Sequence, residues 1–258
     1  MAARRVAALR IILVSYPVAM VLLAVAATVV GGQLSPPAVF WGAVCGISQA
    51  LGVWWFYAAL GAGPISVVSP LTAILVAGVP VTVGLALGER PAALAGVGIV
   101  VALLAVFLVS RDASDPGSAR PFTKKVAWLT VGSGLAFGLN FVLIDQAPVE
   151  AGLWPLVFGR ISATVLVVVF AVLTRNLMPP RGAPLKLALL AAVLDTVANV
   201  AMLLALHSSL LSLAGVLISL YPAATVLLAI VVLRERVTWR QVVGMVLALA
   251  AVAMIAAG

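Results

Sequence analysis

Nine long apolar stretches constrain this chain more than any other feature of its sequence. Each is long enough to cross a hydrocarbon core as a helix, which takes about 20 residues. Backbone polar groups in lipid need partners within their own segment, and these stretches lack the alternating pattern of membrane barrel strands. The sequence therefore predicts an all-α integral membrane protein with about nine transmembrane helices. The predicted spans are 8–30, 37–60, 64–87, 91–110, 126–145, 153–174, 184–206, 209–233 and 238–257.

The composition excludes several classes of protein. Hydrophobic residues make up 65% of the chain and charged residues 9%, which leaves too little polar surface for a soluble domain of 258 residues. The net charge of +8 is spread over short connections, so we expect no nucleic-acid partner. One cysteine, Cys45, and one histidine do not suffice for a disulfide framework or a clustered His/Cys metal site. The sequence also has no G-x-x-x-x-G-K-[ST] phosphate loop, and we expect neither a cofactor nor a resident metal.

The basic residues indicate how the chain is oriented in the membrane. If residue 1 is cytoplasmic, thirteen of the fifteen Lys and Arg residues fall in inside connections or at the inside ends of spans, Arg90 falls outside and Arg160 lies deeper within a span. The positive-inside rule then predicts a cytoplasmic N-terminus and, after nine crossings, an outside C-terminus. Arg4, Arg5 and Arg10 lie before or at the start of the first span as in a signal peptide, but an apolar run above 20 residues favours a retained helix.

The chain repeats itself at an offset of 146 residues. Residues 87–98, LGERPAALAGVG, return as residues 233–244, LRERVTWRQVVG, and the same offset aligns 57–71 with 203–217. This repeat predicts a first unit at 1–112 with four helices, a polar linker at 113–121, and a second unit at 122–258 with five helices. Units of five crossings face opposite ways, which is the inverted arrangement of many carriers. The counterpart of span 126–145 would precede residue 1, so either this helix has been lost or the true start codon lies upstream.

Residues at corresponding places in the two units resemble a known family. Glu89-Arg90 with Gly98, and Pro222 followed by Glu235-Arg236 with Gly244, are similar to EamA-type members of the drug/metabolite transporter superfamily. The resemblance implies ten helices, alternating access, and gradient-driven export or uptake of small metabolites, often amino acids. It also implies two cytoplasmic ends, which disagrees with the charge count. In the first unit Val76 stands where Pro222 has its counterpart, and Pro70 and Pro80 flank that place.

Polar residues inside the spans indicate where a substrate would bind. Asp195 lies eleven residues from each end of its span, about 16 Å of helix, and an ionisable group at that depth costs at least about 2.5 kcal/mol. Gln49 is its counterpart in the first unit, Asn199 shares its helix face, and Tyr221 precedes a proline at the centre of its span. Together they predict a binding site at the midplane, where Asp195 could exchange a proton. The alternative is that Asp195 only bonds another helix.

Other polar and aromatic residues are weaker candidates. Asn140 either lines the same cavity or bridges two helices. Trp54 could stack on a substrate, although an aromatic belt at the interface explains it as well. Arg160, seven residues into its span, is expected to snorkel to the interface, and binding of a substrate carboxylate is the alternative. The G-x-x-x-G stretches at 42–46, 84–88 and 134–138 are typical of close helix packing.

These observations favour a secondary transporter over an enzyme. We expect it to move a small polar metabolite, such as an amino acid or a drug-like compound, across the plasma (cell inner) membrane by alternating access. Protons or another ion would supply the coupling. A homodimer is one possible oligomeric state. The alternatives are a non-transporting membrane subunit and an intramembrane enzyme using Ser133 and His207, although VGSG at 131–134 lacks the first glycine of the nucleophile motif.

The odd number of spans predicts that the two ends of the chain face opposite sides of the membrane. A topology reporter fused at Gly258 should therefore signal the outside, because the positive-inside rule places residue 1 in the cytoplasm. The measurement compares a reporter active only outside with one active only inside. A cytoplasmic signal at Gly258 would show that the charge count is misleading.

Overall fold

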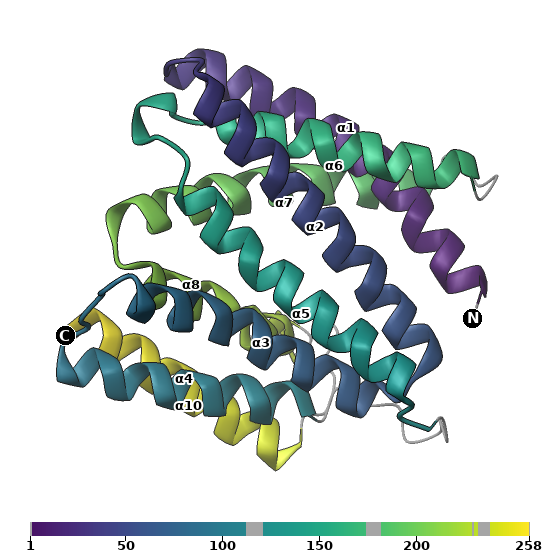
Figure 1. Ribbon diagram of the computed structural model, residues 1–258. Coiled ribbons are helices and arrows are strands. Elements are labelled where there is room, and N and C mark those ends of the chain that lie inside the picture. The colour runs from purple at the N-terminus through teal and green to yellow at the C-terminus, as the bar shows by residue number, and fades with distance from the viewer. Residues whose placement is uncertain (1, 112–120, 174–181, 229, 232–237, 258) are drawn as a thin grey trace. The chain divides into compact units, whose positions relative to one another are not determined.

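The computed structural model describes residues 2–111, 121–173, 182–228, 230–231 and 238–257, and every regular element among them is a helix (Figure 1). This confirms the predicted all-α fold. The predicted linker, apart from Pro121, and the Glu235-Arg236 pair lie outside the described residues. The helices are α1 (Ala2–Val30), α2 (Pro36–Ala62), α3 (Ile65–Ala86), α4 (Ala93–Arg111), α5 (Lys124–Asp145), the short 3-10 helix η1 (Val149–Ala151), α6 (Trp154–Leu173), α7 (Ala183–Ser208), α8 (Leu211–Ser219), α9 (Tyr221–Leu228) and α10 (Trp239–Ala257).

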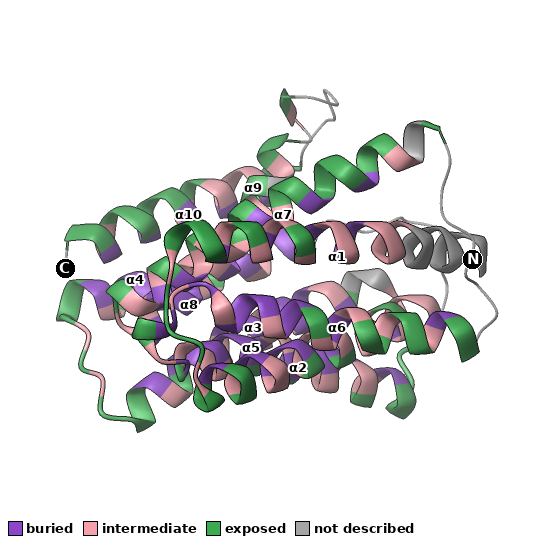
Figure 2. Ribbon diagram, turned by 90° about the horizontal axis from the view of Figure 1, so that it is seen from above, coloured by how far each residue is buried: buried purple, intermediate pink, exposed green. Residues whose placement is uncertain are grey.

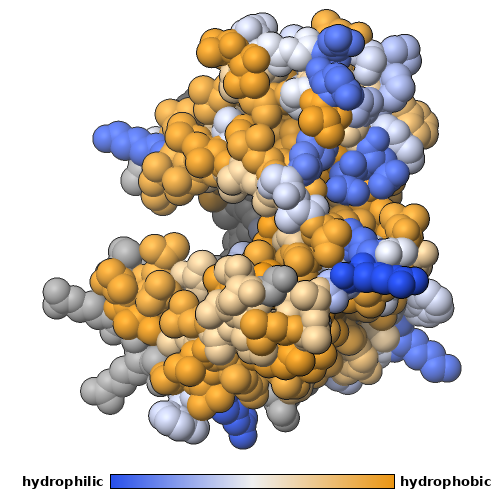
Figure 3. Space-filling model, turned by 90° about the vertical axis from the view of Figure 1, so that its left-hand side faces the viewer, coloured by the Kyte–Doolittle hydropathy of each residue, from blue (hydrophilic) through white to orange (hydrophobic). Residues whose placement is uncertain are grey.

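Nine stretches in the described part of the chain are long and apolar enough to cross a membrane, with α8 and α9 together forming one of them. Their large apolar side chains are not confined to a core: Val25, Leu104 and Leu249, for example, are more than half exposed. Each long helix in Figure 2 carries both buried and exposed residues, and apolar side chains cover most of the face in Figure 3. Exposed apolar surface on this scale is stable in lipid and not in water. The protein is therefore a multi-pass membrane protein.

The helices form two compact structural units, which differ from the two sequence repeats. Each structural unit takes helices from both halves of the sequence. The first unit comprises Met1–Leu51 and Leu143–His207, and the second comprises Gly52–Val142 and Ser208–Gly258. Within the first unit α1 packs on α6, and within the second α3 packs on α8 and α4 on α10. Each of these pairs joins a helix to its counterpart 146 residues away. The boundaries of the sequence repeats themselves stay a prediction.

The packing of α4 on α10 shows the inverted relation between the two halves. A residue early in α4 lies against residues late in α10, and the residue 146 positions further along makes the reverse contact. The two helices are therefore antiparallel, and their contact is reciprocal in the way that a pseudo-twofold axis requires. The contacts are Gly98 against Ala251 and Ile255, and Gly244 against Ala105 and Val109.

Glycine is required at both crossing points of α4 and α10. A Cβ atom at Gly98 would lie 2.9 Å from Cγ1 of Ile255, and one at Gly244 would lie 3.0 Å from the backbone nitrogen of Val109. Lipid gives apolar helix faces little reason to associate, so close van der Waals contact between small residues drives the packing. The LGERPAALAGVG repeat thus ends in a glycine because its helix crosses its own counterpart there.

The Tyr221-Pro222 pair at the centre of its predicted span coincides with a break between two helices. α8 ends at Ser219 and α9 begins at Tyr221, with Leu220 between them in a tight turn. The Leu220 N–H donates to the Leu217 carbonyl at 3.2 Å, and the Ala223 N–H donates to the Leu220 carbonyl at 2.9 Å. Proline lacks an N–H donor and clashes with the preceding turn, which explains why the helix is interrupted here.

Glu89 caps a helix far from it in the sequence. It follows α3 in the turn to α4, and its two carboxylate oxygens accept hydrogen bonds from the N–H groups of Leu211 at 2.6 Å and Ser212 at 2.9 Å. These N–H groups begin α8, whose own N-cap residue, Leu210, offers no side-chain cap. A carboxylate at a helix N-terminus also interacts favourably with the helix dipole. Gly84 leaves room for the Glu89 carboxylate, which a Cβ atom at that position would contact.

We predict that Glu89→Ala lowers the free energy of unfolding by about 1 kcal/mol, within the range of about 0.5–2 kcal/mol for lost helix caps. Gly84→Ala should also destabilise the protein, because its methyl group displaces the same carboxylate. Thermal or denaturant unfolding in detergent measures both effects. Glu150→Ala is the matched control, since the Glu150 side chain is exposed. Equal stability of the Glu89 and Glu150 variants would contradict the capping role.

Candidate functional site

The first unit positions α6 by close backbone contact with α2. Gly42 lies against Pro155 and Gly46 against Gly159, which fits the packing role expected for the G-x-x-x-G stretch at 42–46. The Ser162 hydroxyl donates to the Ala43 carbonyl at 2.9 Å and so ties the same two helices together. These contacts fix the rotation of α6 and with it the direction of the next polar side chain on that helix, Arg160.

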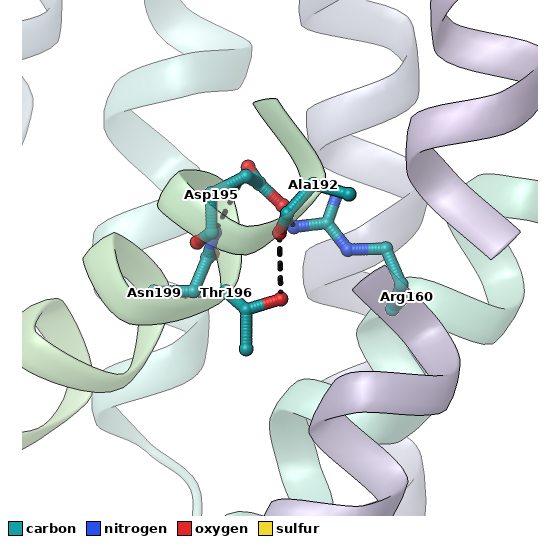
Figure 4. A network of polar contacts seen from close by, with 5 residues as sticks. All are labelled: Arg160, Ala192, Asp195, Thr196 and Asn199. Atoms are coloured by element: carbon teal, nitrogen blue, oxygen red, sulfur yellow. Dashed lines mark hydrogen bonds and ion pairs between the residues drawn. The ribbon is translucent and has the colours of Figure 1, made fainter. Parts of the chain in front are cut away.

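Arg160 forms an ion pair with Asp195 (Figure 4). Nη2 of Arg160, on α6, donates to Oδ2 of Asp195, on α7, at 2.5 Å. The side chain of Arg160 is 3% exposed and that of Asp195 is 35% exposed. The expectation that Arg160 snorkels to the interface is therefore wrong: a carboxylate within reach neutralises its charge inside the protein, so the side chain need not extend to water.

Two further side chains complete this cluster. The guanidinium carbon of Arg160 lies 4.6 Å from the centre of the Tyr16 ring on α1, in the geometry of a cation–π contact. Nδ2 of Asn199 donates to Oδ1 of Asp195 at 3.1 Å and to the Asp195 carbonyl at 2.7 Å. Both carboxylate oxygens of Asp195 thus accept a hydrogen bond. We call Tyr16, Arg160, Asp195 and Asn199 the α6–α7 charge cluster.

The cluster is electrically neutral but incompletely bonded. Nη1 of Arg160 is buried and has no hydrogen-bond partner among the described residues. Burying a charged group is tolerable only when it is paired, and an unused donor on it is a place where another acceptor would be favourable. The arrangement can therefore hold one positive and one negative charge within lipid and still accept a further polar ligand.

The structure brings some of the predicted site residues together. Asp195 and Asn199 share one face of α7 and bond each other, as their spacing predicted. Gln49 is half-buried on α2 in the same unit. The remaining candidates belong to the second unit: Asn140 is buried on α5, Trp54 is half exposed on α2, and Tyr221 is exposed at the start of α9. A substrate-binding role for all six stays a prediction.

Sequence reasoning missed Tyr16 and the pairing of Arg160. A signal for the tyrosine was available in the repeat, because residue 16 is the counterpart of Ser162, two residues from Arg160. Because α1 and α6 are counterparts that pack on each other, a polar or aromatic side chain at position 16 of α1 lies close to Arg160 of α6. Depth in the membrane alone could not supply this information.

Ser133 has the environment of a packing residue. It is fully buried, and its hydroxyl donates to the Thr130 carbonyl at 2.9 Å and lies 3.4 Å from the Thr72 hydroxyl. A nucleophilic serine needs a neighbouring base to take its proton, whereas these partners are a carbonyl and a hydroxyl. The Ser133 contacts therefore favour helix packing over catalysis.

We predict that Arg160 and Asp195 contribute to stability as a pair. Asp195→Leu alone should cost about 3–5 kcal/mol, because it leaves the buried Arg160 charge unpaired, and Arg160→Met should cost less, because Asp195 is partly exposed. The double variant should lose less than the sum of the two single losses, and the difference is a coupling energy of about 1–3 kcal/mol, measured by denaturant unfolding in micelles. Arg160→Met combined with Glu150→Ala serves as a control and should be additive within about 0.5 kcal/mol. Additive losses for Arg160 and Asp195 would show that they do not interact.

Comparison with known proteins places this architecture in a family. Residues 124–257, just over half of the chain, match the model of the EamA-like transporter family. A protein of known crystal structure is similar over 96% of this chain and 88% of its own, with a TM-score of 0.74 and 18% sequence identity, which shows a shared fold. No curated protein sequence matches the chain significantly. The family match covers the second repeat, and the described residues contain nine apolar spans. The chain therefore belongs to the EamA-like transporter family, and it is a multi-pass membrane transporter of the drug/metabolite type.

Proposed function

We propose that the protein is a gradient-driven secondary transporter that moves a small polar metabolite across the plasma membrane by alternating access. The observation that carries this proposal is the ion pair between Arg160 and Asp195. Among the Asp, Glu, Lys and Arg residues in the nine candidate spans of the described chain, these two alone lie away from the ends of their spans. Ionisable residues at such positions usually line a substrate or ion pathway or pair with each other.

Asp195 has the properties of a coupling group. It is the more exposed member of the pair. While the two groups are in contact, the positive charge of Arg160 opposes protonation of Asp195. This opposition weakens when the ion pair opens. When Asp195 releases Arg160, both groups become available to a substrate and a proton. A transporter can use this exchange to link the movement of a polar metabolite to an ion gradient without nucleotide hydrolysis.

The inverted repeat supplies a means of alternating access. In the second unit α4 and α10 make reciprocal contacts at Gly98 and Gly244. If the two repeats exchanged their conformations, the protein would pass from an inward-facing to an outward-facing state. The break between α8 and α9 is the point at which this span would bend during such a change.

Substrate selectivity would come from neutral polar groups in the same structural unit as the pair. Gln49 and Asn199 are half-buried amides in the first unit, and amides position polar substrates without carrying charge. Asn140, Trp54 and Tyr221 belong to the second unit, and a substrate-binding role for these three stays a prediction.

We predict that Asp195→Asn abolishes proton-driven uphill transport while leaving the protein inserted in the membrane. Asparagine keeps an acceptor for Arg160 but cannot take up a proton. The measurement is accumulation of a panel of labelled amino acids and small polar compounds in proteoliposomes with an imposed pH gradient. Accumulation should fall at least about tenfold. This corresponds to about 1.4 kcal/mol or more of free energy that is no longer transferred from the pH gradient to the substrate.

Asp145→Asn is the matched control, because Asp145 is the last residue of α5 and lies at the end of its span. Gln49→Ala and Asn199→Ala should retain coupled transport and mainly raise the apparent KM, since they remove neutral contacts. Wild-type accumulation by Asp195→Asn would return Asp195 to a structural contact between helices. Absence of flux from the lone wild-type protein with every compound tested would instead indicate a subunit that needs a partner.

A further inference from the structure

The α6–α7 charge cluster has an unused donor and no unused charge of the opposite sign. Nη1 of Arg160 is buried without a hydrogen-bond partner in the part of the chain that the structure describes, whereas both oxygens of Asp195 already accept hydrogen bonds, from Arg160 and from Asn199. A ligand that completes the cluster must therefore bring an acceptor. Guanidinium groups bind carboxylates through two parallel N–H donors, and one such donor is already committed to Asp195 here.

A second unpaired donor lies one helical turn from Arg160. Oγ1 of Thr164 is buried and has no partner among the described residues. Residues four apart in an α-helix are neighbours on one face, so Thr164 follows Arg160 along the same face of α6. Thr164 therefore offers a further neutral donor, on the same face of α6, to an anion bound by Arg160, whereas neither group suits a cation or an uncharged apolar ligand.

The relative exposure of the pair indicates how a ligand reaches Arg160. Arg160 is almost completely covered, with Tyr16 stacked on its guanidinium, while more than a third of the Asp195 side chain is exposed. Asp195 therefore lies on the open side of the arginine. An anion approaching from that side meets a carboxylate that already occupies part of its binding group, and it can bind fully only by taking the place of Asp195.

We propose that Arg160 is the binding group for a monocarboxylate substrate, which displaces Asp195 from the guanidinium, and that one proton enters Asp195 for each carboxylate bound. This inference rests on the proposed transport function for its coupling step, although the binding step can be measured by itself. In the resting cluster Arg160 carries +1 and Asp195 carries −1. With substrate bound, Arg160 keeps its proton, the substrate carries −1 and Asp195 is protonated, so the site is neutral in both states.

Charge balance sets the class of substrate and the stoichiometry. The titratable and charged groups placed against Asp195 are Arg160 from α6 and, stacked on the arginine, Tyr16 from α1, so no second cation in the cluster neutralises a further negative charge. A dianion such as a phosphate ester would leave an excess charge within lipid, which is energetically unfavourable. A monocarboxylate with one proton avoids this cost, and it predicts transport that moves no net charge.

Binding is tested with the purified full chain in lipid nanodiscs and four probes built on one carbon skeleton: propionate, propionamide, propylamine and alanine. Thermal unfolding is followed as each probe is titrated at about pH 6, 7 and 8, where propionate stays ionised. Propionate should stabilise the protein saturably, and propionamide and propylamine should not. Because one proton is taken up with the anion, the apparent Kd should rise about tenfold for each pH unit over which free Asp195 is ionised.

Three variants assign the effect to Arg160. Asp195→Asn removes the competing negative charge and the group that takes up the proton, so propionate should bind with no dependence on pH. Arg160→Gln combined with Asp195→Asn leaves no unpaired charge to disturb folding, and it should weaken propionate binding at least tenfold relative to Asp195→Asn. Thr164→Val should weaken binding by a smaller factor. Val165→Ala, a change at an exposed neighbour on α6, is the control and should bind like the wild type.

The outcomes separate this inference from the proposed function. Stabilisation by propylamine or propionamide, tighter binding of alanine than of propionate, or equal binding by the single and double variants would each overturn the carboxylate site. If propionate binds as described but a pH gradient drives no propionate into proteoliposomes, the binding group stands and the transport proposal fails. If transport is proton-driven but responds to membrane potential at constant pH gradient, the proposed ratio of one proton to one carboxylate is wrong.

Discussion

The hydrocarbon interior of the membrane is the constraint on which the rest of this structure depends. It removes water as a partner for polar groups, so each spanning backbone segment must be a helix and a side-chain donor is most favourably placed where it meets an acceptor inside the protein. It also removes most of the hydrophobic drive for helix association. The helices of the second unit therefore meet at Gly98, Gly244 and Gly215, where backbones or small side chains can approach closely. The polar contacts follow the same rule, because Glu89 satisfies the start of α8 and Asp195 satisfies Arg160.

This constraint explains why much of the fold could be predicted from the sequence. A local run of apolar residues predicts a spanning helix, and the helices in the described part of the chain coincide with the nine predicted runs. The internal repeat predicted more than helix number. Two copies of one sequence that face opposite ways can close on each other only through reciprocal contacts, and Gly98 and Gly244 make such contacts. The break before Pro222 was also readable, since the missing backbone donor is a property of one residue.

The partners of the polar side chains could not be read in the same way. The depth of Arg160 follows from its distance to the ends of its span, but the direction of its side chain depends on the rotation of α6. That rotation is set by contacts of Gly42 and Gly46 with residues more than 100 positions away. The same holds for Glu89, which the sequence placed in a turn and which reaches N–H groups 122 and 123 residues further along. Long-range partners of this kind require the packed structure.

Symmetry in the scaffold and asymmetry in the charge cluster are complementary. The contacts of α4 with α10 occur in both directions, so each repeat contributes one helix to this interface of the second structural unit. In the first sequence repeat the counterparts of Arg160, Asp195 and Asn199 are Val14, Gln49 and Val53, and only Asp195 has a polar counterpart. Two copies of a charged pair would double the cost of burying charge in lipid and would give two competing sites. The single pair of Arg160 and Asp195 keeps the charge buried away from the span ends at one place among the described residues, in the first structural unit.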